Sequence, residues 1–298
     1  MVETFTSCVS WEFPNNQGIG CNTISAQDTP NLLTFLKELR AHPIGGNLIL
    51  TAAASISPWN DPNGNPSDIS PFAKVLDYIA VMNYDVWGSW SPAVGPNAPL
   101  NDTCAPPQYQ QGSAVSAVQA WKSAGLPSDQ LVLGVASYGH SFLVDVSVAL
   151  TAQGEVAAYP KFEPEQPRGD SADDEPGVDI CGAMTGWGGV FNFWGLVEGR
   201  FLDEKGKPLQ GIRYRYDECS QTVRFCGRFQ LLADAERASY QPYVYNVTSQ
   251  VMVSYDDARS FEAKGTFIKN YRLRGYAMWE AAGDYNDILI NAIKQGGG

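Results

Sequence analysis

One glutamate, Glu12, stands in a setting that suggests chemistry, inside the stretch WEFP (11–14). We expect this stretch at the end of a strand, where residues 8, 10 and 12 share a face. That face carries Cys8, Ser10 and the Glu12 carboxyl. Because a catalytic carboxyl is tuned by a neighbouring charged or hydrogen-bonding group, Glu12 by itself makes a poor active site.

The chain has few of the residues that other kinds of catalytic centre require. The chain has two histidines, His42 and His140, and six cysteines without the CxxC spacing of a metal site. Metal sites and nucleophilic triads both depend on histidine or cysteine in such clusters. We therefore expect no metal, no cofactor and no Ser-His-Asp triad.

The composition narrows the class of ligand. Only 17% of the 298 residues are charged while 12% are aromatic, which suits a protein that handles a neutral, hydrogen-bonding ligand such as a sugar. The net charge of -12 offers no basic face to a nucleic acid or an anionic lipid surface. The longest apolar stretches, such as 131–136, are strand-sized, so we expect no membrane span.

Buried-strand and helical patterns alternate at both ends of the chain. We predict strands at 47–56, 78–84, 130–138 and 274–279, and helices at 30–42 (capped by Thr29), 71–76, 113–124, 257–270 and 286–294. Such alternation indicates a parallel sheet or a (β/α) barrel. The rhythm breaks between about 142 and 251, where Gly, Pro, Asp and aromatic residues dominate as in an inserted α+β module.

These patterns predict three parts of the chain. They are a partial (β/α) barrel at 1–142, an α+β insertion module at 143–250, and a final barrel strand and helix at 251–298. Without the insert about 190 residues remain, which is short for eight βα units. We can place five strands, counting the one that ends at Glu12, and an open five-stranded sheet would expose its edges.

Four stretches, in order along the chain, resemble glycoside hydrolase family 18, the chitinases, and more closely its secreted fungal members. WEFP resembles the end of the DxxDxDxE motif on the fourth barrel strand, and VMNYD (81–85) resembles the sixth-strand MxYD. LGVASYGHSF (133–142) and RGYAMWE (274–280) resemble the seventh and eighth strands. The resemblance implies an α/β fold of the (β/α)8 TIM-barrel family, here truncated to strands four to eight, with a chitinase insertion module.

The resemblance also implies an activity, the hydrolysis of β-1,4-N-acetylglucosamine linkages in chitin. In this family the acetamide oxygen of the substrate attacks the anomeric carbon, so the stereochemistry is retained without a protein nucleophile. Glu12 would be the general acid. Tyr84 would donate a hydrogen bond to the acetamide oxygen, and Asp85 would line the same subsite.

Substrate-binding roles follow from the same resemblance. Trp279 would carry the apolar face of the distorted sugar, and Trp90 would be a platform for the next one. Met82 and Tyr138 would line the cleft. His140 stands where many members carry arginine, which leaves its contact open.

Each of these assignments has a structural alternative. Tyr84 and Asp85 could simply end a strand and start a turn. Trp279 could be a core tryptophan, and Trp90 could pack on its own loop.

The aspartates of the catalytic motif are missing. Phe5, Cys8 and Ser10 occupy their positions. Loss of such an acid–base partner lowers activity by about 10²–10⁴-fold. The activity of the chain as written is therefore in question. The alternative function is that of a catalytically impaired chitinase-like protein that binds chitin oligosaccharides, and a third possibility is a chain that cannot close its barrel and has no function.

Two segments fit the hypothesis of a translated intron. Residues 223–241 (VRFCGRFQLLADAERASYQ) separate DECSQT from PYVYN, which follow each other directly in the fungal members. A valine codon begins with GT and a glutamine codon can end in AG. Likewise, the AG of a serine codon at position 10 could end an intron whose removal restores an aspartate before Trp11.

The cysteines suggest a pairing under this hypothesis. Removing both segments deletes Cys8 and Cys226, and we then expect the disulfides Cys21–Cys104 and Cys181–Cys219. A local Cys219–Cys226 bridge is the alternative.

The localisation rests on the family and on weak local signs. The sequons at Asn101 and Asn246 and the even number of cysteines suggest an extracellular protein, although this chain has no signal peptide. We expect a monomer whose partner is chitin or its oligosaccharides.

Overall fold

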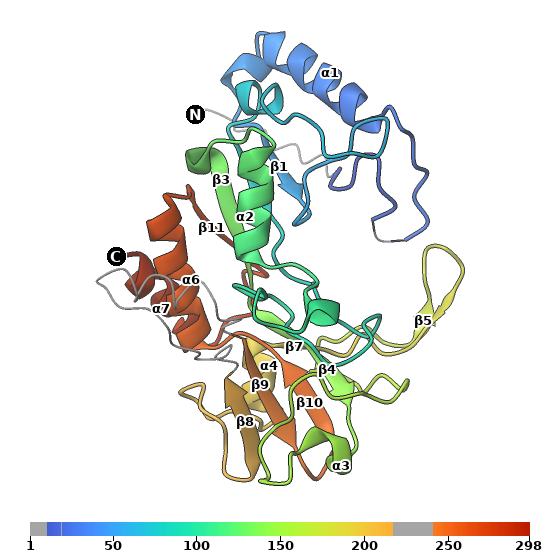
Figure 1. Cartoon of the computed structure of the whole chain (residues 1–298), viewed down its shortest axis with the longest axis vertical. Helices are drawn as coiled ribbons and strands as arrows, with labels where there is room; N and C mark the ends of the chain where they lie inside the picture. The colour runs from blue at the N-terminus through green and yellow to red at the C-terminus, as the bar shows by residue number, and fades with distance from the viewer. Residues whose placement is uncertain (1–10, 19, 217–240) are drawn as a thin grey trace.

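The fold is built mainly on a parallel sheet and an antiparallel sheet (Figure 1). The computed structural model describes residues 11–18, 20–216 and 241–298. The first sheet and its helices occupy the upper part of the view, and the second sheet occupies the lower part.

The first sheet is parallel and has the order β1-β2-β3-β11. Its strands are β1 (Thr51–Ala54), β2 (Tyr78–Val81), β3 (Leu131–Ala136) and β11 (Gly275–Trp279). All six residues of β3 are buried, whereas β1 and β11 at the edges are partly exposed. Four of the five predicted strands are therefore present, each shorter than its predicted range.

Four helices pack around this sheet: α1 (Asp28–Ala41), α2 (Ala114–Ser123), α6 (Ala258–Tyr271) and α7 (Ile288–Gly297). Ser113 caps α2 and Asp257 caps α6, each in a capping box with a serine three residues later. One apolar core joins buried side chains of the helices and strands, among them Leu36, Ile79, Trp121, Leu133 and Phe261.

The second sheet is antiparallel and has the order β7-β4-β10-β9-β8. Its strands are β4 (Tyr138–Leu143), β7 (Val190–Asn192), β8 (Ile212–Tyr216), β9 (Pro242–Asn246) and β10 (Val251–Ser254). Two short helices, α3 (Val146–Ala149) and α4 (Phe193–Glu198), accompany it. A separate hairpin, β5 (Gly177–Val178) and β6 (Met184–Thr185), extends to the side.

A single residue, Ser137, connects the two sheets, because β3 ends at Ala136 and β4 begins at Tyr138. The second sheet thus starts at the carboxyl end of the most buried parallel strand. In chain order the sheet begins with β4 at 138 and ends with β10 at 254, so the predicted module bounds at 143 and 250 fall at the last residue of β4 and just before β10.

Some local predictions were wrong in detail. Helix α1 begins at Asp28, and Thr29 is a buried helical residue rather than the cap. The helix predicted at 71–76 is only a 3₁₀ turn over Phe72–Lys74, because Asp77 already donates to the Leu50 carbonyl beside the sheet. Residues 11–13 have no regular secondary structure.

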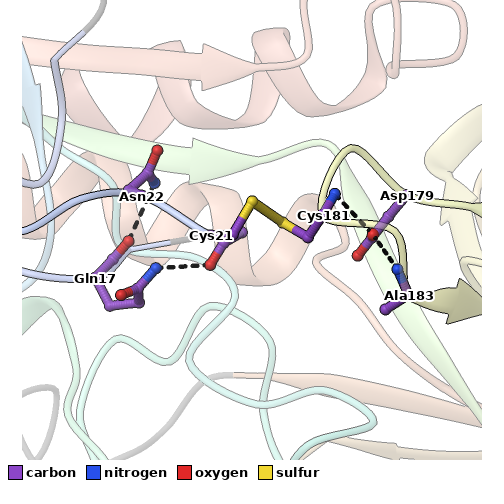
Figure 2. The surroundings of a disulfide bond; sticks show 7 residues. Gln17, Cys21, Asn22, Asp179, Cys181 and Ala183 are labelled. Atoms are coloured by element: carbon purple, nitrogen blue, oxygen red, sulfur yellow. Dashed lines mark hydrogen bonds between the residues drawn. A yellow bond between two sulfur atoms is a disulfide. The ribbon is translucent and has the colours of Figure 1, made fainter.

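The predicted cysteine pairs were wrong as well. Cys21 forms a disulfide with Cys181, which joins the loop after WEFP to the β5–β6 hairpin (Figure 2). Both the Cys21–Cys104 and the Cys181–Cys219 pairs are thereby excluded, and Cys104 is itself disulfide-bonded. The prediction paired Cys21 with Cys104 inside the barrel part and Cys181 with Cys219 inside the insertion module, whereas the fold brings the β5–β6 hairpin against the N-terminal loop.

The two segments assigned to a translated intron lie almost wholly outside the described residues. The exception is Gln241, which is fully buried. Its side chain accepts a hydrogen bond from the Ala98 backbone and donates one to the Tyr255 carbonyl. Of the two sequons, that at Asn101 is closed to a glycan, since this residue is 2% exposed.

Candidate active site

The carboxyl ends of the parallel strands meet at one edge of the first sheet, which is where α/β folds place ligands. Met82 to Asp85 directly follow β2, and Trp279 is the last residue of β11. Tyr138 follows β3 after one residue. These side chains therefore come together although the strands are far apart in the sequence.

A cleft of about 1010 Å³ lies at this edge. It is lined by all seven residues that the sequence analysis selected, namely Glu12, Met82, Tyr84, Asp85, Trp90, Tyr138 and Trp279. Residues that it did not select also line the cleft, including Asn16, Ser55, His140, Asp174 and Asn192. The cleft is thus shared by the first sheet, the second sheet and the N-terminal loop.

Asp85 is held in the cleft by two side-chain contacts. Its Oδ1 accepts a hydrogen bond from the Tyr138 hydroxyl at 2.7 Å and lies 2.8 Å from Nε2 of His140. Its backbone has a φ of 54°, a left-handed conformation that few non-glycine residues adopt. Asn97 holds this conformation, because its Oδ1 accepts from the Asp85 N–H at 2.9 Å while its amide donates to the Tyr138 carbonyl at 3.0 Å.

The electrostatics of this group favour an ionised Asp85. Burial raises the pKa of Asp85, but the hydrogen bond and charge of His140 and the hydrogen bond from Tyr138 outweigh it, so the pKa lies below its ordinary value. Burial and the nearby Asp85 charge raise the pKa of Tyr138 well above the ordinary value of a tyrosine. Tyr138 therefore stays a hydrogen-bond donor to Asp85.

Tyr84 lies beside this network, with its ring edge-on to that of Tyr138 at 6.1 Å. Burial, followed by the negative charges of Asp85 and Glu12, raises the pKa of Tyr84 to about 12. Gly134 on β3 makes room for the ring, since a Cβ there would lie 2.9 Å from Cε1 of Tyr84. Tyr84 is thus held as a protonated phenol that can donate into the cleft.

Trp90 is an exposed platform that contacts its own loop. Its side chain is 63% exposed, and its ring lies against Gly88, where a Cβ would come within 2.3 Å of the ring. The ring also meets His140 edge-on, with centroids 5.5 Å apart. Packing on its own loop and lining the cleft are therefore both true of Trp90.

Trp279 is 63% exposed, so the alternative of a core tryptophan is wrong. Its carbonyl accepts from the Ser137 N–H at 2.8 Å, and the Ser137 hydroxyl donates to the Glu280 carbonyl at 2.6 Å. The peptide bond between Trp279 and Glu280 is cis. The residue that connects the two sheets thus also fixes the end of β11.

Glu12 lines the cleft on the side of the N-terminal loop. It also lines an adjoining cavity of about 350 Å³ with Trp11, Asn22 and Asp28. Its charge acts on Tyr84 across the cleft. The positions of the missing motif aspartates, Phe5, Cys8 and Ser10, lie outside the described residues.

His140 and Asn97 are the residues whose contacts the sequence analysis missed. His140 was noted without a partner, and the fold gives it Asp85 and Trp90. Asn97 lies in a loop far from any strand end, so no spacing rule could have identified it. Among the described residues no cluster of His, Cys, Asp and Glu could hold a metal ion, and no helix is long and apolar enough to cross a membrane.

Comparisons with known proteins agree with the resemblance. The chain is 50% identical over 293 residues to a chitinase-like effector of Moniliophthora perniciosa and 49% identical over 294 residues to one of Moniliophthora roreri. Each alignment covers 97% of this chain, which spans 62% and 66% of the length of these two relatives.

Among solved structures, the chitinase RmChi1 of Rhizomucor miehei superposes with a TM-score of 0.79 at 29% identity, covering 97% of this chain and 72% of that one. This likeness gives the chain a chitinase fold of the α/β class. Residues 9–284 match the family described as Glycosyl hydrolases family 18. Because this match spans nearly the whole chain, the protein is a member of glycosyl hydrolase family 18.

Proposed function

We propose that the cleft binds oligosaccharides of β-1,4-linked N-acetylglucosamine. The observation that carries this proposal is the presence of two tryptophans, each 63% exposed, in the same cleft as the Asp85 network. Sugar rings have apolar faces that stack on aromatic rings and polar edges that need hydrogen bonds. The net charge of -12 suits a neutral polymer better than an anionic one.

Each residue then has a role that its surroundings support. Trp279 carries the apolar face of one sugar and Trp90 that of the next, while Met82 and Tyr138 line the cleft. The Tyr84 phenol, which stays protonated, donates to the acetamide oxygen. Asp85 accepts a hydrogen bond from the ligand. Its side chain is 40% exposed, while its Oδ1 already accepts from the Tyr138 hydroxyl.

Hydrolysis is the second candidate function, and the presence of Glu12 in the same cleft favours it. The acetamide oxygen would bond to the anomeric carbon as the glycosidic C–O bond breaks and the Glu12 carboxyl gives its proton to the leaving oxygen. Water would then open the cyclic intermediate and return a proton to Glu12, with retention of configuration. Tyr84 would orient the acetamide group for the first step.

We infer that this chain binds chitin oligosaccharides but hydrolyses them inefficiently. Ser10 replaces the aspartate that would share the proton of Glu12, and the loss of such a partner costs about 10²–10⁴-fold. The two Moniliophthora relatives are named chitinase-like effectors, which is compatible with an impaired enzyme. The first candidate is therefore an oligosaccharide-binding, catalytically impaired chitinase-like protein.

Further features belong to the same proposal. The parallel sheet is part of a (β/α)8 barrel, corresponding to its later strands, and the antiparallel sheet is the α+β insertion module. The protein acts as a monomer outside the cell, as the family resemblance implies.

Calorimetry with chitotetraose, and chromatography of its products, test the proposal. We expect wild type to bind the tetrasaccharide and Glu12→Gln to bind it equally well. Ser10→Asp should raise product formation by about 100-fold or more, since it restores the acid–base partner. Absence of binding by the wild-type chain would refute the proposed function, and fast hydrolysis by the wild-type chain would reverse the order of the two candidates.

A further inference from the structure

His140 occupies a junction in the cleft that none of the proposed roles uses. It lies on β4 and is 8% exposed, so its ring is fixed by the protein rather than by solvent. Its neighbours in the antiparallel sheet are Val190 on β7 and Ser254 on β10. The ring therefore projects from the second sheet toward residues that belong to the first.

On one side His140 reaches the carboxylate of Asp85. Nε2 lies 2.8 Å from Oδ1, the same oxygen that accepts from the Tyr138 hydroxyl at 2.7 Å. An ionised carboxylate can only accept hydrogen bonds, so Nε2 must carry a proton. Two donors on one oxygen fix the rotation of the carboxyl group and leave the rest of the exposed Asp85 side chain to a ligand.

On its other side His140 supports Trp90. The two rings meet edge-on with centroids 5.5 Å apart, and Gly88 supports the Trp90 ring from its own loop. An exposed tryptophan on a loop loses rotamer freedom when it binds a ligand, and a ring that is already supported loses less. His140 is thus the side chain that contacts both a polar group and an aromatic platform of the cleft.

We propose that His140 is a positioning residue of the oligosaccharide site, holding the Asp85 carboxylate and the Trp90 ring in one fixed relation. The inference rests on the proposed function, since it assigns a role within that site. It predicts that a ligand which contacts both groups loses most affinity when the His140 donor to Asp85 is removed, and less affinity when only the ring beside Trp90 is removed.

Two variants separate the contacts. His140→Phe keeps a ring edge for Trp90 but removes the donor to Asp85, whereas His140→Gln keeps a donor at a similar distance from the backbone and removes the ring. A hydrogen bond to a charged group contributes enough to change affinity by about 10–100-fold. We expect His140→Phe to weaken chitotetraose binding by that factor and His140→Gln to recover most of the loss, with both variants still unfolding cooperatively.

A measurement on the unliganded wild-type protein tests the contact between His140 and Asp85 even if a His140 variant fails to fold. The chain has only two histidines, so ¹⁵N-histidine labelling of the wild-type protein gives two imidazole patterns, and His42→Gln assigns them. We expect the His140 ring to carry its proton on Nε2, and Asp85→Asn to move the His140 signals while the His42 signals stay in place.

The outcomes are distinct. If wild type binds no chitotetraose, the proposed function fails and the inference falls with it. If wild type binds and His140→Phe binds as well, or if Nε2 of His140 lacks a proton, the inference alone is overturned. The inference is supported if His140→Phe loses chitotetraose affinity and His140→Gln retains most of it.

Discussion

The two walls of the cleft are held by different means. On one wall, Tyr84, Asp85, Tyr138 and His140 are fixed by hydrogen bonds and by buried strands. On the other, Glu12 precedes a loop that carries both local hydrogen bonds, such as that from the Gln17 amide to the Gly20 carbonyl, and a longer-range one from the Asn15 amide to the Asp61 carbonyl. The Cys21–Cys181 disulfide links this loop to the β5–β6 hairpin (Figure 2).

The difference teaches that binding and acid catalysis depend on separate supports. The wall with Asp85 suits a ligand, because hydrogen bonds from Asn97, Tyr138 and His140 fix Asp85 in the cleft. The wall with Glu12 carries, besides its hydrogen bonds, a covalent link across 160 residues of sequence. A change in one wall should therefore leave much of the other intact.

The largest expected effect concerns the disulfide. Replacing Cys21 and Cys181 together by serine should lower the free energy of unfolding by about 2–5 kcal/mol, because the bridge closes a long loop and restricts the unfolded chain. Urea unfolding measures this loss. Chitotetraose affinity below the unfolding transition should change little, and a complete loss of binding would show that the two walls are not separately supported.

The next effect in size concerns the exposed aromatic platform. Trp279→Ala should weaken chitotetraose binding by about 2 kcal/mol, roughly 30-fold, since a large exposed aromatic side chain in a cleft is a typical hot spot. Calorimetry measures the change. Trp187→Ala is the matched control, because Trp187 packs against Arg168 and does not line the cleft. Equal losses in the two variants would contradict the role of Trp279.

A smaller effect is expected within the Asp85 wall. Gly134→Ala puts a methyl group 2.5 Å from the Val81 carbonyl oxygen and 2.9 Å from the Tyr84 ring. Such overpacking costs about 1–3 kcal/mol and displaces Tyr84. We expect lower stability together with weaker binding, measured by urea unfolding and calorimetry. Gly186→Ala, which meets nothing within 4 Å, should be neutral, and a neutral Gly134→Ala would refute the packing argument.

The smallest effect is the pH dependence of the same wall. The pKa of Asp85 is lowered in the folded protein from the ordinary 3.8, so its ionised form stabilises the fold above that pH. This contribution is lost as the pH falls through the lower folded value. Unfolding of wild type and Asp85→Asn in urea should therefore differ at pH 5 and converge as the pH falls below about 4. A difference that grows on acidification would contradict the direction of the shift.

Much of the parallel sheet could be predicted because its signal is local. Six consecutive buried residues at 131–136 and the apolar run at 78–81 fit strands covered on both faces. The capping serine at 113 and Asp257 likewise mark helix starts through their own neighbours. The start of α1 was missed because Asp28, which accepts from the Ser25 N–H, organises the turn before the proline.

The antiparallel sheet was harder to predict in its pairing. Its strands come from residues between 138 and 254, and β4 pairs with β7 and β10 across intervals that no short pattern spans. The same reason explains the disulfide error. Cys21 and Cys181 meet because the hairpin folds back toward the N-terminal loop, which depends on the whole chain.

By itself, the sequence determined the chemistry that is available: a carboxyl in WEFP, a phenol and a carboxyl in VMNYD, and a tryptophan in RGYAMWE. These lie at the ends of local elements, and residue type and period are properties of short segments. Only the tertiary structure decided that Tyr138 and His140 share one oxygen of Asp85, and that Cys21 joins Cys181. Contacts of this kind connect residues from different elements, so the packing of the sheets, and not the neighbouring sequence, fixes them.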